Sequence, residues 1–145
     1  MNDSRPEMLF AAHCLAGRVR VLNRVITSIY DDALRPFGVR VSQMGILTAI
    51  AAAGPLRQVD VCKLLHLEKS TLSRDLERLL ESGWVCSTKG KGRAVNLEIT
   101  PAGRDMLASV VPAWHLAQAK ATELLTPAGV AGIFKALGGL WNVEE

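Results

Sequence analysis

Hydrophobic residues recur with helical spacing along most of the chain and alternate as in a strand only beyond its midpoint. The clearest helical pattern is a run of leucines at positions i, i+4, i+7 and i+8, namely Leu72, Leu76, Leu79 and Leu80. This spacing places the four side chains on one face and predicts an amphipathic helix over residues 69–82. Gly83 is expected to end the helix by adopting a left-handed conformation.

Two strands joined by a cationic loop are predicted directly after this helix. They span residues 84–88 and 94–99, and the second alternates polar residues with three apolar ones, Val95, Leu97 and Ile99. The loop, residues 89–93, reads Lys-Gly-Lys-Gly-Arg, with three cations and no acid. A pair of short helices followed by such a hairpin is the plan of a winged helix-turn-helix.

Capping signals predict the helices before this segment. Residues 4–7, Ser-Arg-Pro-Glu, have the form of a capping box, so the first helix is expected to begin near Arg5 or Pro6 and to run to Leu34. Ser42 is expected to cap a second helix that stops at Gly54-Pro55. The third helix is expected over residues 58–65, just before the leucine-rich one.

Helix-start signals recur after the hairpin. Thr100-Pro101 and Thr126-Pro127 each place an N-cap residue before a proline at the first helical position. They predict one helix from Pro101 to about Leu125, in which Pro112 causes a kink or lengthens a turn, and then a last helix.

The predicted fold is therefore mainly α with a small β-hairpin wing, a winged helix-turn-helix with a helical dimerisation region. Residues 1–38 and 101–145 are assigned to dimerisation, and residues 39–100 to a DNA-binding domain. The outer helices carry more apolar surface than such a domain could cover, which favours a homodimer. A compact monomer with a six-helix core is the alternative.

The leucine-rich helix has a polar face that suits DNA. Its hydroxyl and guanidinium groups near the N-terminus can reach phosphates and base edges in a major groove. Taken alone, such a helix is more often plain core packing, and a Lys/Gly loop is more often a solvated hairpin tip. The order of the parts favours DNA binding, because a helix pair and a basic wing are used together.

The segments LEKSTLSRDLERLLESGWV and KGKGRAVNLEITPAG resemble the multiple-antibiotic-resistance regulator (MarR) family of bacterial transcription factors, as does RVITSIYDDALRPFGVRVSQMGIL. The resemblance implies that the helix over residues 69–82 enters the major groove, with Ser70, Thr71, Ser73 and Arg74 facing DNA. It also implies that Arg93 enters the minor groove. The full set of expected DNA contacts is Lys69, Ser70, Thr71, Ser73, Arg74, Arg78, Lys89, Lys91 and Arg93.

Three positions depart from the family's pattern. Lys91 stands where the wing usually has Asp, which removes an orienting partner for Arg93 but adds positive charge. Glu68 replaces an Asp before the recognition helix and is a weaker N-cap, because its longer side chain reaches the first amides less readily. His66 replaces a turn glycine and is expected to carry left-handed strain.

Composition limits the classes of function. The chain has 145 residues, 49% of them hydrophobic, and a net charge of +3 that by itself does not point to nucleic acid. No apolar run approaches the ~18 residues that cross a membrane, and the first residues do not read as a signal peptide, so we expect a cytoplasmic protein without a membrane partner. Cys14, Cys62 and Cys86 would be reduced there.

The family resemblance also implies regulation by a small aromatic or phenolic effector, or by thiol oxidation. Candidate effector-binding residues are His13, Arg18, Arg24, Trp114 and His115, although the arginines are more often solvated or ion-paired and Trp114 more often lies in a core. Cys14 is a candidate redox residue, with a buried small residue as the alternative. It lies two positions before the family's peroxide-sensing cysteine, where this chain has Ala16, and Tyr30 is the only tyrosine.

No arrangement typical of an enzyme, a metal site or a bound cofactor is visible in the sequence. We therefore expect a non-enzymatic, sequence-specific regulator of transcription, a repressor, that binds a near-palindromic double-stranded DNA operator as a homodimer and is released by a small-molecule effector. Two alternatives stay open: a thiol-based redox-sensing repressor using Cys14, and a winged-helix protein-interaction module that does not bind DNA.

Overall fold

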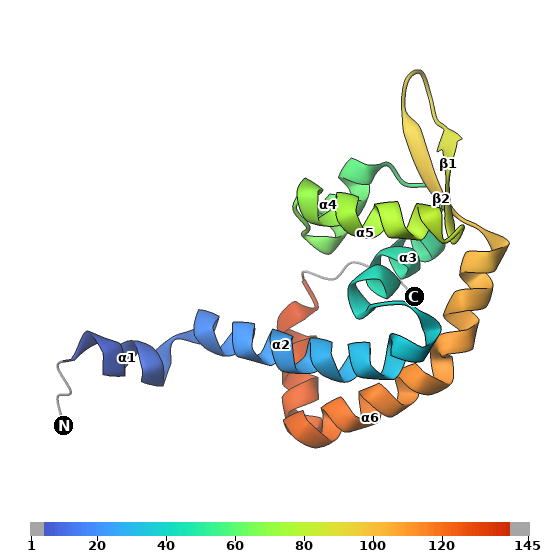
Figure 1. Cartoon of the computed structure of the whole chain (residues 1–145). Coiled ribbons are helices and arrows are strands. Elements are labelled where there is room, and N and C mark those ends of the chain that lie inside the picture. Colours follow the sequence, from blue (N-terminus) through green and yellow to red (C-terminus); the bar gives the residue numbers. More distant parts are fainter. Residues whose placement is uncertain (1–4, 140–145) are drawn as a thin grey trace.

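The computed structural model describes residues 5–139 of the chain. Within this range it is mainly helical, with one two-stranded antiparallel sheet, which confirms the predicted winged helix-turn-helix fold (Figure 1). The elements are α1 (Pro6–His13), α2 (Leu15–Leu34), a 3-10 turn η1 (Arg35–Phe37), α3 (Val41–Ala53), α4 (Gln58–Leu65), α5 (Lys69–Glu81), β1 (Val85–Lys89), β2 (Val95–Ile99) and α6 (Pro101–Leu137).

A single apolar core holds together the helix-turn-helix unit, by which we mean α3, α4, α5, β1 and β2. Three of the four leucines predicted to line α5 are buried in it, whereas Leu80 is 37% exposed. The other fully buried members come from α3, α4 and the two strands: Ile46, Leu47, Ile50, Val61, Val85 and Leu97. In the antiparallel register Val85 faces Ile99 and Lys89 faces Val95, so the hairpin extends away from this core. Val95 near its tip is therefore exposed.

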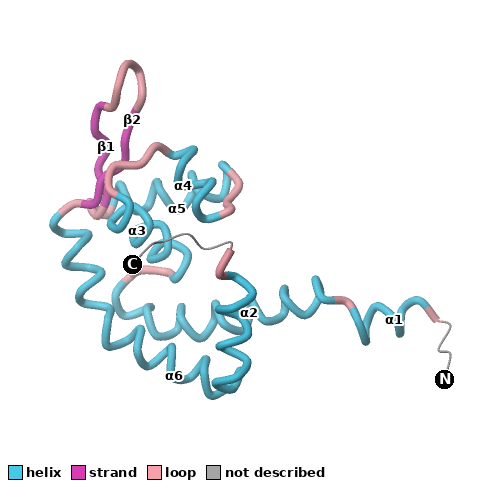
Figure 2. The backbone as a smooth tube through the Cα atoms, turned by 180° about the vertical axis from the view of Figure 1, so that it is seen from behind, coloured by secondary structure: helices cyan, strands magenta, loops and turns pink. Residues whose placement is uncertain are grey.

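The long helices α2 and α6 lie side by side on the side of the helix-turn-helix unit opposite the wing (Figures 1 and 2). A smaller cluster of Leu34, Val39 and Val110 joins them to the unit, with Trp84 and Met106 packed against it. The helix α1 projects away from the rest of the molecule (Figure 2). Within the described part of the chain, no helix is long and apolar enough to span a membrane.

The first predicted helix is in fact two helices. Pro6 begins α1 as expected, but the backbone at Cys14 is extended (φ −70°, ψ 106°) and interrupts the helix between α1 and α2. The Cys14 thiol accepts a hydrogen bond from the Gly17 amide at 3.4 Å and so acts as the N-cap of α2. Ser4, the proposed capping residue of α1, lies outside the described residues.

The predicted cap of α3 at Ser42 is wrong, because α3 already begins at Val41. The Asp31 carboxylate at the end of α2 accepts a hydrogen bond from the Val41 amide at 2.8 Å. The Gln43 side-chain oxygen accepts a second one from the Arg40 amide at 3.1 Å. A contact from another helix, which local sequence does not reveal, thus sets the start of α3.

Both helix-start signals after the hairpin are confirmed. Thr100 caps α6 by accepting a hydrogen bond from the Gly103 amide at 3.0 Å. Thr126 interrupts α6 with φ 65° and ψ 153°, and its hydroxyl oxygen accepts from the Gly129 amide at 3.2 Å. Pro112 keeps helical backbone angles, while the path of α6 curves along its length (Figure 1).

The start of α6 is packed tightly against the end of α5 and the base of the wing. The Thr100 hydroxyl donates to the Gly83 carbonyl at 2.6 Å, and the Thr100 amide donates to the Trp84 carbonyl at 3.0 Å. A Cβ atom at Gly103 would lie only 2.2 Å from the Trp84 carbonyl oxygen. The left-handed Gly83 (φ 73°), predicted to end the recognition helix, completes this joint.

Gly103→Ala is expected to lower the free energy of unfolding by about 1–3 kcal/mol. The added methyl group would overlap the Trp84 carbonyl oxygen and force the start of α6 away from the base of the wing. Gly45→Ala is the matched control, since a Cβ at Gly45 within α3 meets no atom within 4 Å. That variant should be stabilised by about 0.5–1 kcal/mol. Urea unfolding at one protein concentration measures both, and equal effects would contradict the close approach at Gly103.

Candidate nucleic-acid interface

The recognition helix α5 buries one face and exposes the other. Leu72, Leu76 and Leu79 are at most 2% exposed, and they fix the rotation of the helix about its axis. The opposite face is solvated over its whole length. Every predicted contact residue on α5 lies on this exposed face: Lys69, Ser70, Thr71, Ser73, Arg74 and Arg78.

The turn before α5 has the strain expected from its sequence. His66 ends α4 in the left-handed region (φ 52°, ψ 42°), and the Leu67 amide donates to the Cys62 carbonyl at 2.9 Å. Glu68 occupies the N-cap position of α5, but its side chain makes no capping hydrogen bond. The Ser73 hydroxyl donates to the Lys69 carbonyl at 2.8 Å, so toward a ligand it can offer only its lone pairs.

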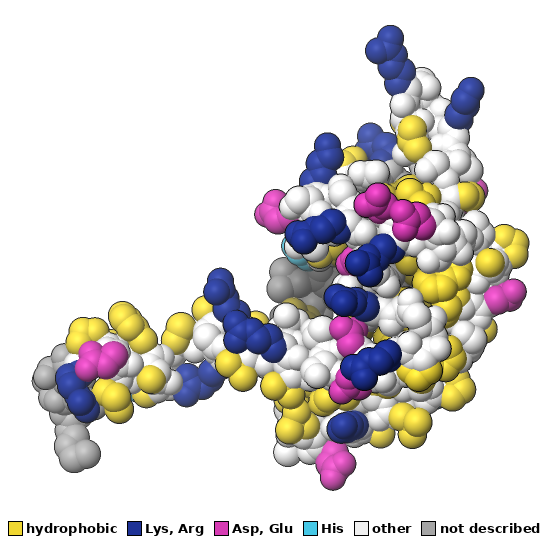
Figure 3. All heavy atoms as spheres, in the orientation of Figure 1, with side chains coloured by type: hydrophobic (Ala, Val, Ile, Leu, Met, Phe, Trp, Pro, Cys, Tyr) yellow, Lys and Arg dark blue, Asp and Glu magenta, His cyan; other side chains and the backbone are white. Residues whose placement is uncertain are grey.

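The tip of the wing is a small, tightly folded loop with a cationic surface. The Gly90 amide donates to the Ala94 carbonyl at 2.9 Å, and Gly92 adopts φ 63°. The three predicted contact residues of the wing, Lys89, Lys91 and Arg93, are all exposed. Lys and Arg side chains project from the tip, well clear of the helices (Figure 3). The exposed face of α5 carries both cations and acids, whereas the wing tip is purely cationic. Together they form a solvent-facing polar surface whose Lys and Arg side chains can contact DNA phosphates.

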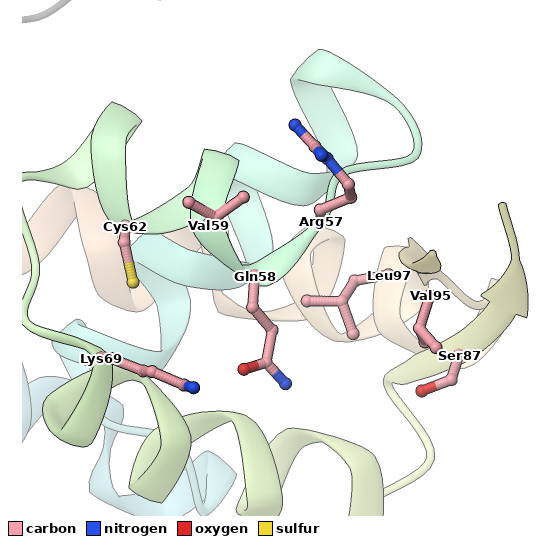
Figure 4. Close-up of a pocket in the computed structure, with 8 residues that line it drawn as sticks. All are labelled: Arg57, Gln58, Val59, Cys62, Lys69, Ser87, Val95 and Leu97. Atoms are coloured by element: carbon pink, nitrogen blue, oxygen red, sulfur yellow. The ribbon is translucent and has the colours of Figure 1, made fainter. Parts of the chain in front are cut away.

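A hollow of about 520 Å³ lies between α4, the start of α5 and the wing (Figure 4). We call it the α4–wing hollow; it is lined by Arg57, Gln58, Val59, Cys62, Lys69, Ser87, Val95 and Leu97. Arg57 at its rim bonds to Asp60 at 2.9 and 3.2 Å, and this hydrogen bond lowers the pKa of the Asp60 carboxyl group.

Arg57, Gln58 and Ser87 also lie near the start of the recognition helix, and no sequence pattern predicted them there. Their proximity depends on the bridge between Leu56 and Leu97, whose amides and carbonyls exchange hydrogen bonds of 3.1 and 2.8 Å. This bridge ties the loop before α4 to the second strand of the wing. No local pattern in the sequence signals such a long-range contact.

The structure brings together only some of the predicted effector and redox residues. A second hollow of about 630 Å³, the α2–α6 hollow, is lined by Cys14, Arg18, apolar residues of α1 and α2, and Leu124 and Leu125 of α6. His13 and Arg24 are exposed and are not among its lining residues. Trp114 and His115 form their own edge-to-face ring pair on α6, with centroids 5.0 Å apart.

Cys14 and Trp114 are more exposed than the sequence suggested. Cys14 is exposed, so the interpretation of a buried small residue is wrong, and Trp114 is only half-buried. All three cysteines are free thiols, with Cys62 half-buried at the α4–wing hollow and Cys86 exposed on β1. Within residues 5–139, no cluster of three His, Cys, Asp or Glu side chains could hold a metal ion.

Comparison with known proteins decides the family. The model of the MarR family matches residues 37–94, which span α3 to the wing. The uncharacterized HTH-type transcriptional regulator YwoH of Bacillus subtilis is 32% identical over 92 residues, which cover 63% of this chain and 67% of YwoH. The chain belongs to the MarR family. This MarR-family protein is therefore a DNA-binding transcriptional regulator, as the resemblance in its recognition helix and wing implied.

Solved structures share the fold of this MarR-family chain. A cysteine-to-serine mutant of E. coli MarR complexed with operator DNA matches with a TM-score of 0.77 and 24% identity, over 91% of this chain and 97% of that chain. BpsR of Bordetella bronchiseptica, described with regulation of its DNA binding by 6-hydroxynicotinic acid, matches with a TM-score of 0.75 and 21% identity. That match covers 89% of this chain and 95% of BpsR. At these identities the likeness shows the fold alone.

Glu68→Asp is expected to raise the free energy of unfolding by about 0.5–1 kcal/mol, because the shorter carboxylate can accept from the first amides of α5. Glu68→Ala is the control: it should cost little, since Glu68 makes no capping bond to lose. Chemical denaturation followed by circular dichroism measures both variants. A large loss in Glu68→Ala would show that Glu68 already caps the helix.

Proposed function

We propose that this MarR-family protein is a homodimeric repressor that binds a near-palindromic operator and leaves it when a small effector binds. The observation that carries the proposal is the surface made by α5 and the wing, where all nine predicted DNA contacts are exposed. Occupancy of a promoter by such a dimer would block transcription. The operator complex of the similar E. coli MarR supports this mode of binding.

In the proposed complex, α5 enters the major groove and the wing reaches the adjacent minor groove. Arg74 lies on the exposed face of α5, where a guanidinium can bond two acceptors of a guanine. Ser70, Thr71 and Ser73 offer short polar groups beside it. Arg93 at the wing tip carries a charge suited to the narrow, negative minor groove of A·T-rich DNA.

The dimer is proposed from the apolar residues that the single chain leaves uncovered on its outer helices. These large exposed side chains on α1, α2 and α6 are Met8, Leu9, Phe10, Leu15, Val19, Val21, Val25, Val111, Leu116, Leu124, Phe134 and Leu137. A patch of this extent marks an interaction site. Residues 1–38 and 101–145 would form the interface, and two-fold symmetry would set the recognition helices about 34 Å apart, one turn of DNA.

The effector is proposed to be a small aromatic acid bound in the α2–α6 hollow. The hollow combines apolar walls with one cation, Arg18, whose guanidinium donates to the Ala12 carbonyl at 2.6 Å and keeps other donors available for a carboxylate. The regulation of BpsR by 6-hydroxynicotinic acid, an aromatic acid, supports this class of ligand. Binding there would change the angle between α2 and α6, and with it the spacing of the two recognition helices.

Arg74→Ala should weaken specific binding by about 1–3 kcal/mol and relax the base preference at one position of each half-site, because the guanidinium reads a base. Arg93→Ala should weaken binding with less change in sequence preference. Selection of a binding site from a random DNA pool, followed by fluorescence anisotropy, measures both. Arg104→Ala, an exposed arginine on α6, is the matched control; if all three variants bind alike, the proposed docking is wrong.

Sedimentation at micromolar concentration is expected to show a dimer. Leu124→Asp should shift it toward monomer, since a charge would be buried in the interface. Val95→Asp is the matched control, because Val95 on the wing is 56% exposed and Leu124 is 55% exposed. A monomeric wild-type protein, or equal dissociation of both variants, would contradict the proposed dimer and with it the near-palindromic operator.

A further inference from the structure

A cationic groove runs from the recognition helix to the start of α3. Two hollows of about 400 and 360 Å³ make up this α3–α5 groove, and Arg40, Gln43 and Arg78 line both of them. On this face of the molecule, Lys and Arg side chains interleaved with Asp and Glu form a column that descends from α5 (Figure 3). The remaining lining residues are Asp31, Arg35, Gly38, Val39, Ser42, Thr71, Arg74 and Asp75.

The two carboxylates and the amide side chain in the groove are already hydrogen-bonded within the protein. Asp31 accepts from the Val41 amide at 2.8 Å, and Asp75 accepts from the Gln43 side-chain amide at 3.4 Å. Gln43 is only 4% exposed, and its oxygen accepts from the Arg40 amide at 3.1 Å. Because the amides of Arg40 and Val41 are taken up by these bonds, we expect side chains to supply the main contacts to an anion in the groove.

Three of the groove's four guanidinium groups, those of Arg40, Arg74 and Arg78, are available, and Arg74 is already assigned to base contacts. Arg35 forms an ion pair with Asp32, whereas among the described residues Arg40 and Arg78 have no ion-pair partner. Both are exposed, one at the N-cap of α3 and the other on the last turn of α5. Guanidinium groups suit bidentate binding of phosphate oxygens.

We infer that the α3–α5 groove binds the phosphodiester backbone of the DNA strand that borders the major groove, with Arg40 and Arg78 as its phosphate ligands. The inference rests on the proposed docking of α5. The groove is continuous with the proposed DNA-binding face of α5, because Thr71 and Arg74 on that face line the same groove as Arg40. Phosphate contacts fix the position of a protein on DNA without reading its sequence. Arg40 thus becomes a positioning residue that lies outside both the recognition helix and the wing.

The test compares Arg40→Gln with the wild type in DNA binding over a range of salt concentrations. Loss of one phosphate contact per subunit should weaken binding at least about tenfold, by a similar factor for operator and unrelated DNA. The slope of log affinity against log salt should become shallower by about 0.9 per subunit. Arg104→Gln, which makes the same charge change on α6, should leave the slope unchanged.

Four results separate the possibilities. If Arg40→Gln matches the wild type while Arg74→Ala loses operator binding, the inference is overturned and the proposed function stands. If neither variant affects DNA binding, the proposed function itself fails. An altered base preference in Arg40→Gln would assign it a base contact and overturn the phosphate assignment. Calorimetry with inorganic phosphate gives the fourth result. If Arg40→Gln loses phosphate binding but keeps its affinity for DNA, the groove is a site for free anions, and the inference is also overturned. Unchanged urea unfolding verifies that the variant folds.

Discussion

The contact between Gly103 and the Trp84 carbonyl is the constraint on which the arrangement of the molecule depends. A residue without a side chain lets the first turn of α6 touch the backbone at the base of the wing, and the two bonds of Thr100 fix that contact from the other side. The end of α5, the start of β1 and the start of α6 therefore meet at one rigid joint. A rotation of α6 has to move the recognition helix and the wing together.

This joint would transmit a movement at the proposed effector site to the recognition helix. The α2–α6 hollow lies between the long helices, far along α6 from Gly103, and the cluster of Leu34, Val39 and Val110 packs the two helices against the helix-turn-helix unit. Close-packed contacts of this kind change between discrete arrangements rather than deform gradually. A change of angle between α2 and α6 would thus reach α5 as a rigid-body movement, and two subunits related by symmetry would double its effect on the operator.

Local signals in the sequence predicted most elements, and tertiary contacts account for what they missed. The spacing of Leu72, Leu76 and Leu79, the caps at Thr100 and Thr126, and the basic hairpin were sufficient for the winged fold. The start of α3 was misplaced because Asp31, ten residues away, determines it. Arg40 and Arg57 were not assigned to the interface, since neither lies on α5 or the wing and only folding brings them beside α5. The break at Cys14 interrupts a continuous helical pattern and has no proline or glycine at that position to signal it.

The unfilled N-cap at Glu68 bears on how the free protein behaves. Amides in the first turn of α5 have no side-chain acceptor from that position, so this turn is expected to open toward solvent more readily than a capped turn would. The segment that carries most of the predicted base contacts is then expected to become more ordered when DNA binds. Part of the selectivity for one sequence would accordingly appear as ordering of the protein, visible as slower amide exchange at residues 69–71 in the complex than in the free protein.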